Sequence, residues 1–247
     1  MSKTTRPTTL RLLTSWSFSR LSDYTTCPAK AKYKHIMKLP EPGNPAMDRG
    51  LVIHKVAENY IKGALPAKVP ANLESFSQLF KDLRAKYKKK TPMAMMVEDS
   101  WAFTRTWTQT RYDDWANCWL RIKVDCAHYA SLSELHIYDW KTGRIRPERQ
   151  EEYAQQLHLY ATAALVLFPH VKVVKPALKY LDEGVTYPDT PHDVKQLTFK
   201  RKDLPVLMKA WETRTQAMLH DDIFAPRPSA SCRYCHYRQE NGGPCQY

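Results

Sequence analysis

The chain has 247 residues, of which 43% are hydrophobic and 26% charged, a composition that is ordinary for a globular protein with one sizeable core. No stretch approaches the roughly 20 apolar residues that cross a bilayer, and the basic residues 1–11 lack the apolar segment of a secretory signal, so we expect a cytoplasmic protein without a membrane partner. The net charge of +13 favours a polyanionic partner, above all nucleic acid, although a merely basic protein is the alternative.

In chain order, the spacing of apolar residues predicts an α/β protein in which helices come first and a group of strands follows. Pro and Gly residues mark the ends of these elements. Helices are expected at residues 17–26, 49–62, 73–90, 148–168 and 203–220, with a loop at 40–45 and a linker at 66–70. Strands are expected at residues 97–107, 119–127, 134–140, 171–181 and 195–200, and the first three favour an antiparallel meander.

Asp139-Trp140-Lys141, which is followed by Thr142-Gly143, is the most informative segment and ends the alternating stretch 134–140. Side chains two positions apart on a strand point to one face, so Asp139 and Lys141 project together. A carboxylate beside an ammonium can hold a divalent metal ion and orient a water molecule, which suits hydrolysis of a phosphodiester. Asp125, on the polar face of the preceding expected strand, is a second candidate ligand.

Other polar residues complete an ordered set. His54 lies on the expected helix 49–62, and Gln156 and Tyr160 are four residues apart on one face of the helix 148–168. A single His on a helix is more often structural, and a single Asp on a strand usually contacts water. The combination in this order points to a catalytic site. An inert cluster of ion pairs is the alternative.

These motifs resemble those of the RecB-like nucleases of the PD-(D/E)xK superfamily. The resemblance rests on Gly50-x-x-x-His54, on Asp125, on the segment from Asp139 to Gly143 and on Gln156-x-x-x-Tyr160, in that order. Residues 17–28 and the terminal cysteines extend it over most of the chain. It implies a restriction-endonuclease-like α/β core, with a central mixed sheet that contains an antiparallel meander and is flanked by helices.

The resemblance also implies roles for individual residues. A divalent metal ion, Mg²⁺ or Mn²⁺, would be bound by His54, Asp125, Asp139 and the main-chain carbonyl of Trp140. Lys141 would position the attacking water or help to deprotonate it, and Gln156, Tyr160 and Arg49 would contact the nucleic acid. Carboxylates suit Mg²⁺, whereas an imidazole ligand shifts the preference toward Mn²⁺.

Three further positions bear on this site. Glu98 matches a weaker family position and is a possible outer-shell group. The chain departs from the family at Ile122, where a Gly is usual, and at Cys126, where an Arg or similar residue is usual. Neither departure removes a ligand, but both put substrate contacts near Asp125 in doubt.

The cysteines are placed unevenly. Cys232-x-x-Cys235 and Cys245 cluster near the end of the chain, Cys27 stands alone near the start, and a chain without a signal peptide is not expected to form disulfides. The layout resembles the iron–sulfur nucleases of the superfamily, found in helicase-nuclease complexes and in CRISPR adaptation, which implies a [4Fe-4S] cluster on these four residues. Because Cys235 and Cys245 are widely spaced, a Zn²⁺ site with His236 or Cys27 is the alternative.

We therefore expect residues 1–247 to form a single nuclease domain, with an N-terminal helix and loop at 17–48, a core at 49–220 and a cysteine segment at 221–247 that packs with Cys27. The expected activity is a metal-dependent DNA exonuclease that acts on single-stranded ends in recombination, repair or replication, and the expected protein partner is a helicase or recombination protein. The basic residues 81–90 are candidate phosphate contacts. The alternatives are an assembly module with an auxiliary nuclease site, as in CRISPR spacer acquisition, and a nuclease for RNA.

Overall fold

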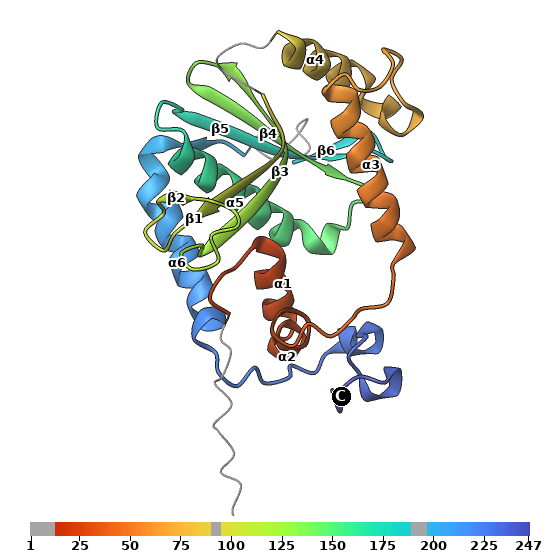
Figure 1. The fold of residues 1–247 in the computed structure, drawn as a ribbon, viewed down its shortest axis with the longest axis vertical. Coiled ribbons are helices and arrows are strands. Elements are labelled where there is room, and N and C mark those ends of the chain that lie inside the picture. Colours follow the sequence, from red (N-terminus) through yellow and green to blue (C-terminus); the bar gives the residue numbers. More distant parts are fainter. Residues whose placement is uncertain (1–12, 90–94, 189–196) are drawn as a thin grey trace, which may run out of the picture. The chain divides into compact units, whose positions relative to one another are not determined.

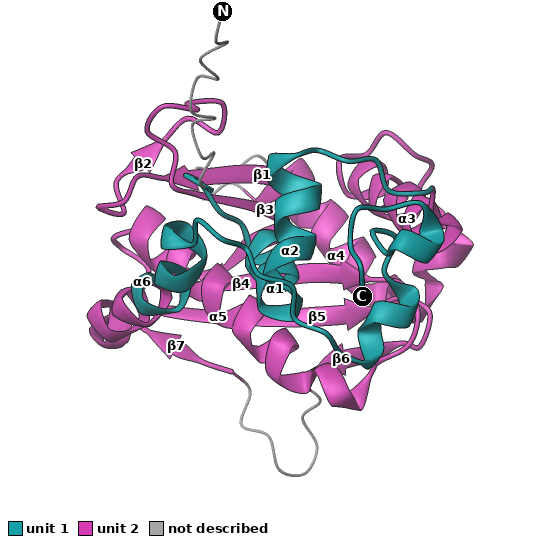
Figure 2. Cartoon of the chain, turned by 90° about the horizontal axis from the view of Figure 1, so that it is seen from below, with its two compact units in different colours: residues 1–42, 212–247 teal, residues 43–211 magenta. Residues whose placement is uncertain are grey.

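The computed structural model describes residues 13–89, 95–188 and 197–247. Residues 1–11, residue 90 and the start of the expected strand 195–200 lie outside these ranges. The chain divides into two compact units, which Figure 2 colours separately. Unit 1 comprises Met1–Pro42 and Glu212–Tyr247, and unit 2 comprises Gly43–Trp211. The expectation of a single nuclease domain remains a prediction.

Unit 2 is built on a mixed β-sheet, which crosses the centre of Figure 1. The strands of the described residues are β1 (Met96–Phe103), β2 (Gln109–Thr110), β3 (Leu120–Ser131), β4 (Glu134–Lys141), β5 (Val173–Tyr180), β6 (Val185–Tyr187) and β7 (Phe199–Lys200). Their order is β2-β1-β3-β4-β5-β6, and β7 pairs with β5. The pairs β1–β3 and β3–β4 are antiparallel, as the meander prediction requires, whereas β4 and β5 are parallel.

Parallel pairing needs a crossover connection, and helix α5 (Gln150–Leu167) provides it between β4 and β5. Apolar side chains surround much of this helix, and Leu157, Leu159 and Leu165 are fully buried. The hydroxyl of Tyr160 reaches Asp139 on β4. Because strand side chains alternate between faces, α5 lies against the sheet face that carries Asp139.

Helices α3 (Pro45–Ile61) and α4 (Ser77–Lys88) contribute to the core on the other face. There Phe80 packs on Trp140, with ring centroids 4.9 Å apart. Helix α3 begins four residues before the expected start because Asn44 caps it and Pro45 occupies its first turn, so the expected loop 40–45 ends one residue early. The expected helix 73–90 is divided into a 3₁₀ segment, Ala71–Phe76, and α4.

Unit 1 combines the two ends of the chain. Helix α1 (Phe18–Thr26) is capped by Ser17 and ends at Thr26, as the expected helix 17–26 does. Pro28 then starts α2 (Pro28–Ala31), since Pro fits a first helical position. A π-helix, Lys32–Ile36, follows, and the C-terminal segment forms the 3₁₀ turns Ala230–Tyr234 and Gln239–Asn241. The Tyr24 hydroxyl donates to Asp221 at 2.8 Å, so the N- and C-terminal segments are joined within this unit.

Helix α6 (Leu204–His220) contains the boundary between the units. None of the helices in the described ranges combines the length and the apolar character needed to cross a membrane.

Candidate active site

Two acids meet where β3 and β4 lie side by side. Asp125 on β3 is 8% exposed and Asp139 on β4 is 5% exposed. The strands pair at Cys126 with Tyr138, so the next residues outward, Asp125 and Asp139, point to the same face. The peptide N–H of Trp140 donates to Asp125 Oδ2 at 2.7 Å, which fixes one carboxylate on the neighbouring strand.

His54 and Glu98 join Asp125 from two other elements. His54 Nδ1 lies 3.4 Å from Asp125 Oδ2 and 4.0 Å from Glu98 Oε1. One potential ligand atom from each of the three residues lies within 4.8 Å of the other two. Glu98 reaches this position from β1 with an unusual positive φ of 54°, and the pairing of β1 with β3 skips Glu98 without a change of register. Glu98 is therefore grouped with His54 and Asp125, and its role as an outer-shell group remains a prediction.

Asp139 is outside that group and is held by its own partners. Its Oδ1 accepts hydrogen bonds from the Tyr160 hydroxyl at 2.7 Å and from Gln156 Nε2 at 3.3 Å, and Gln156 also donates to Tyr160 at 2.8 Å. The Lys141 ammonium lies 2.6 Å from Oδ2 as an ion pair. Oδ2 is buried, so this ion pair places an ammonium against a carboxylate oxygen that lies away from water.

Helix α3 approaches the end of β4 closely. A Cβ atom at Gly50 would lie 3.3 Å from Thr142 Oγ1, so the small residue permits the approach. Arg49 forms an ion pair with Asp182 at 2.6 Å, and the N–H of Gly143 donates to the same carboxylate. Gly50 and Gly143 thus lie at one junction between α3 and the end of β4. This junction sets the position of α3 relative to Asp125 and Asp139.

The electrostatic balance at this cluster is that of a cation site. Burial lowers the pKa of His54, but the hydrogen bond and charge of Asp125, with the charges of Asp139 and Glu98, outweigh it and raise the pKa to about 9. Burial and the charge of Asp139 raise the pKa of Asp125, and burial and the charge of Asp125 raise that of Glu98. The imidazole proton therefore partly neutralises carboxylates that repel one another.

The structure places most of the residues predicted for the site close to one another. His54 and Asp125 are together, and Asp139, Lys141, Gln156 and Tyr160 form a contiguous group beside them. Trp140 supplies a peptide N–H to Asp125, and the ligand role of its carbonyl remains a prediction. Arg49 is engaged with Asp182 and has no contact with the acids.

The two departures from the family pattern are both core positions. Ile122 and Cys126 are buried, at 4% and 0% exposure, so they pack inside unit 2 and cannot contact a substrate.

Comparison with known proteins agrees with the site. The family model of the PD-(D/E)XK nuclease superfamily matches residues 15–239, and the chain therefore belongs to this superfamily. No curated protein matches the sequence. One similar solved structure is that of a "Putative exonuclease" from Eubacterium rectale, with 11% identity, a TM-score of 0.44 and coverage of 90% of this chain and 88% of that chain. Another is that of SSO0001, with 13% identity, a TM-score of 0.42 and coverage of 92% of this chain and 85% of that chain.

Superfamily membership supports nuclease activity with a divalent metal ion, and the donor set fits such an ion. Two carboxylates and one imidazole are within reach of a single point, and the carboxylate of Asp139, paired with Lys141, lies on the neighbouring strand beside them. Hard oxygen donors suit Mg²⁺, and the imidazole is acceptable to Mn²⁺.

Unit 1 contains Cys27, Cys232, Cys235 and Cys245, all as free, half-buried thiols. Burial and the charges of Cys245, Cys27 and Cys235 raise the pKa of the Tyr33 hydroxyl. The peptide N–H of Arg227 donates to Cys27 Sγ at 3.4 Å, and that of Ser229 donates to Cys232 Sγ at 3.3 Å. Among the described residues, no group of three thiols has its sulfurs all within 4.8 Å of one another.

Proposed function

We propose that the protein is a Mg²⁺- or Mn²⁺-dependent DNA exonuclease that hydrolyses phosphodiester bonds at single-stranded ends. The observation that carries the proposal is the group of His54, Glu98 and Asp125 beside the ion pair of Asp139 and Lys141. Carboxylates and an imidazole gathered at one point, with an ammonium next to them, match what phosphodiester hydrolysis requires.

His54, Asp125, Asp139 and Glu98 would hold the cation, with the Trp140 carbonyl as the further ligand implied by the resemblance. The bound cation supplies positive charge to offset the charge that develops on the phosphate, and it lowers the pKa of a coordinated water. Lys141 would donate a hydrogen bond to the attacking water and orient it, since its ammonium already lies 2.6 Å from Asp139. Asp139 would in turn be kept in place by Tyr160 and Gln156.

Nucleic-acid contacts beyond the acids would come from Arg49, Gln156 and Tyr160 and from the basic residues of α4. Contacts of this kind to backbone phosphates carry no sequence information, so binding should weaken steeply with salt. Action in recombination, repair or replication, a helicase or recombination partner, and a cytoplasmic location complete the proposal. The whole chain would act as one nuclease domain.

The cysteines of unit 1 would hold a [4Fe-4S] cluster through Cys27, Cys232, Cys235 and Cys245. A tetrahedral Zn²⁺ site with bonds of about 2.3 Å brings its sulfurs within about 4 Å of one another. A cubane ligated at four corners keeps its cysteine sulfurs further apart than a single ion does, so the distances between the four sulfurs would distinguish the two assignments. The peptide N–H groups aimed at Cys27 and Cys232 also support a cluster, because such hydrogen bonds stabilise charged sulfur ligands.

The nuclease proposal is tested with matched variants and end-labelled DNA. A single-stranded oligonucleotide labelled at the 5′ or the 3′ end is digested with Mg²⁺ or Mn²⁺ by the wild type, Lys141→Met and Lys175→Met. Lys175 is the control because it pairs with a strand carboxylate, Glu134 at 2.9 Å, outside the acid cluster. Lys141→Met should abolish cleavage, and Lys175→Met should retain it.

Wild-type cleavage by Lys141→Met would refute the proposed site. Cutting of matched RNA alone would replace the DNA assignment by an RNA nuclease. Binding of DNA with cleavage only after a partner is added would favour the assembly module.

The cluster is tested separately. Anaerobically purified protein should absorb in the visible region and contain iron, whereas zinc alone in the metal analysis would refute the iron–sulfur assignment.

A further inference from the structure

The loop between β2 and β3 exposes a large aromatic side chain. Trp115 is 71% exposed, an unusual position for a tryptophan. The guanidinium of Arg121 lies 3.6 Å from the centroid of its ring, and the Tyr112 ring is 5.5 Å from the same guanidinium. Asp114 holds the loop by accepting hydrogen bonds from Thr110 Oγ1 at 2.7 Å and from the N–H of Asn117 at 3.2 Å. Trp115 is therefore presented on an organised loop.

Arg121 has no acidic partner among the described residues. The residue is 8% exposed, its Nε donates to Cys118 Sγ at 3.3 Å, and its Nη2 is buried without a hydrogen-bond partner. A buried guanidinium normally pairs with a carboxylate, because an unpaired buried charge is costly. Here the positive charge is balanced mainly by the aromatic faces of Trp115 and Tyr112.

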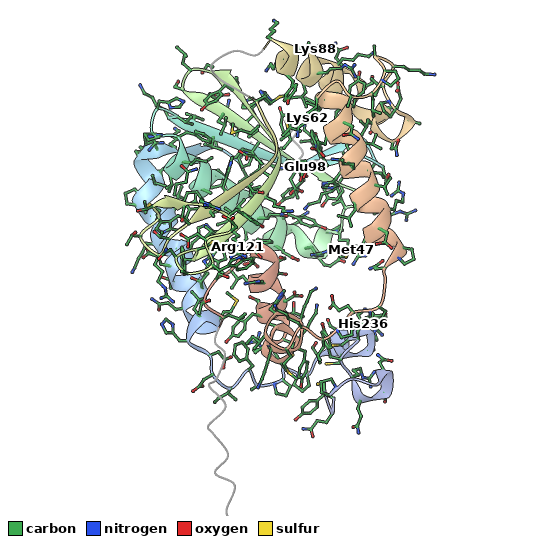
Figure 3. All side chains as sticks on the ribbon, in the orientation of Figure 1. Met47, Lys62, Lys88, Glu98, Arg121 and His236 are labelled. Carbon is green, nitrogen blue, oxygen red and sulfur yellow. The ribbon has the colours of Figure 1, made fainter. Side chains whose placement is uncertain are left out.

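Arg121, which stacks on Trp115, shares a strand and a face with Asp125. Arg121, Lys123 and Asp125 follow one another at two-residue spacing on β3, so their side chains project to one side. Lys123, between them, is exposed. Burial and the charge of Asp125 raise the pKa of Glu98, and the charge of Lys123 acts in the opposite direction. Figure 3 labels Glu98 beside α3 and Arg121 toward the β2 end of the sheet. The step of four residues from Arg121 to Asp125 spans about 13 Å along β3. A few nucleotides of stretched single-stranded DNA can cover this distance.

We propose that Trp115, backed by Arg121, is a stacking platform for an unpaired base of the DNA strand whose phosphate enters the acid cluster. This inference rests on the proposed function and adds a reason for single-strand preference. A base stacks on an exposed indole only when it is not stacked in a duplex. Lys123 lies between the platform and Asp125, where it can contact the connecting phosphate.

A nucleic acid fits this surface better than an apolar protein segment does. The positive charge of Arg121 lies against the ring, and Lys123 follows two residues along the strand. Neither forms an ion pair with a carboxylate in the described ranges, and the chain as a whole carries +13. A π-face beside cationic groups is the combination that proteins use to bind single strands without sequence preference.

The platform is tested by binding without cleavage. Fluorescence anisotropy with a labelled oligothymidylate in EDTA compares the full-length wild type with Trp115→Ala, Trp115→Phe and Leu132→Ala. Leu132 is the control because it is 72% exposed and lies beyond the other end of β3. Loss of one stacking contact should raise the Kd of Trp115→Ala about tenfold. Trp115→Phe and Leu132→Ala should stay near the wild type, and binding of a blunt duplex should not change.

An abasic scan identifies the contact itself. Removal of one base at successive positions should weaken wild-type binding most at one position a few nucleotides from the end, and Trp115→Ala should be insensitive there. Equal Kd values for Trp115→Ala and wild type on the single strand, or an equal loss on the duplex, would overturn the platform. So would a wild type without a sensitive position.

The two proposals fail in different ways. DNA cleavage by the wild type together with unaltered binding by Trp115→Ala would refute only the platform. Trp115-dependent binding in a protein that never cleaves DNA would refute only the nuclease.

Discussion

The hydroxyl of Tyr160 is the most direct test of how the acids are held. It donates to Asp139 Oδ1 at 2.7 Å inside the protein, and burial and the charge of Asp139 raise its pKa well above the usual value, so it stays protonated under working conditions. Tyr160→Phe removes this donor and leaves the ring in place. Asp139 then keeps only the longer contact of 3.3 Å with Gln156 on the same oxygen.

The expected cost follows from that geometry. A hydrogen bond to a charged group contributes about 1.5–3 kcal/mol, and the remaining Gln156 contact places the loss at the lower end, about 1.5–2 kcal/mol. For a chain of this size such a loss lowers the Tm by roughly 3–8 °C. If Asp139 is a metal ligand, loss of the group that orients it lowers metal affinity roughly 10- to 100-fold.

Two measurements check this expectation. Thermal unfolding without metal gives the stability loss, and the rise in Tm with added Mn²⁺ gives the change in affinity without relying on cleavage. Tyr60→Phe is the control, because Tyr60 is also buried and donates to a neutral acceptor, the Ala67 carbonyl at 3.0 Å. It should cost about 1 kcal/mol and leave the Mn²⁺ dependence unchanged.

The reasoning would be refuted by a Tyr160→Phe protein whose Mn²⁺ dependence equals that of the wild type. A stability loss of the same size in both variants, with no difference in metal response, would assign Tyr160 a packing role only.

Three further changes have defined outcomes. Burial and the charges of Lys86 and His136 lower the pKa of His128 to about 4, below the value near 6.5 in the unfolded chain. Between these pH values the unfolded state binds a proton that the folded state does not. Up to about 3 kcal/mol of stability is therefore lost as the pH falls from 6.5 to 4. His128→Leu should flatten this slope in urea titrations at several pH values, and an unchanged slope would contradict the assignment. Glu98→Gln should raise the Mn²⁺ concentration for half-maximal cleavage roughly 10-fold or more, whereas an unchanged midpoint would return Glu98 to the outer shell. Cys27→Ser should remove the visible absorbance of anaerobic protein, and full retention would exclude Cys27 as a cluster ligand.

Much of the fold could be predicted from local pattern. Alternation predicted β4 almost to the residue, and helical spacing predicted α5 within two residues at its N-terminal end and one at its C-terminal end. The short strands β2 and β6 were missed because two or three residues carry too little periodicity. The early start of α3 was missed because Asn44 and Pro45 were read as loop residues, although Asn is a good cap and Pro a good first helical residue.

The sequence by itself determined that Asp139 and Lys141 share a strand face and that Gln156 and Tyr160 share a helix face, because both facts depend only on the repeat of one element. Only the tertiary structure decided which of these faces meet. The antiparallel register of β3 and β4 places Asp125 beside Asp139, and the irregular backbone at Glu98 turns its carboxylate toward His54. Contacts between distant segments depend on register and packing, which no local repeat encodes. The position of Glu98 beside His54 and Asp125, and the stacking of Arg121 on Trp115, therefore emerge only in the folded chain.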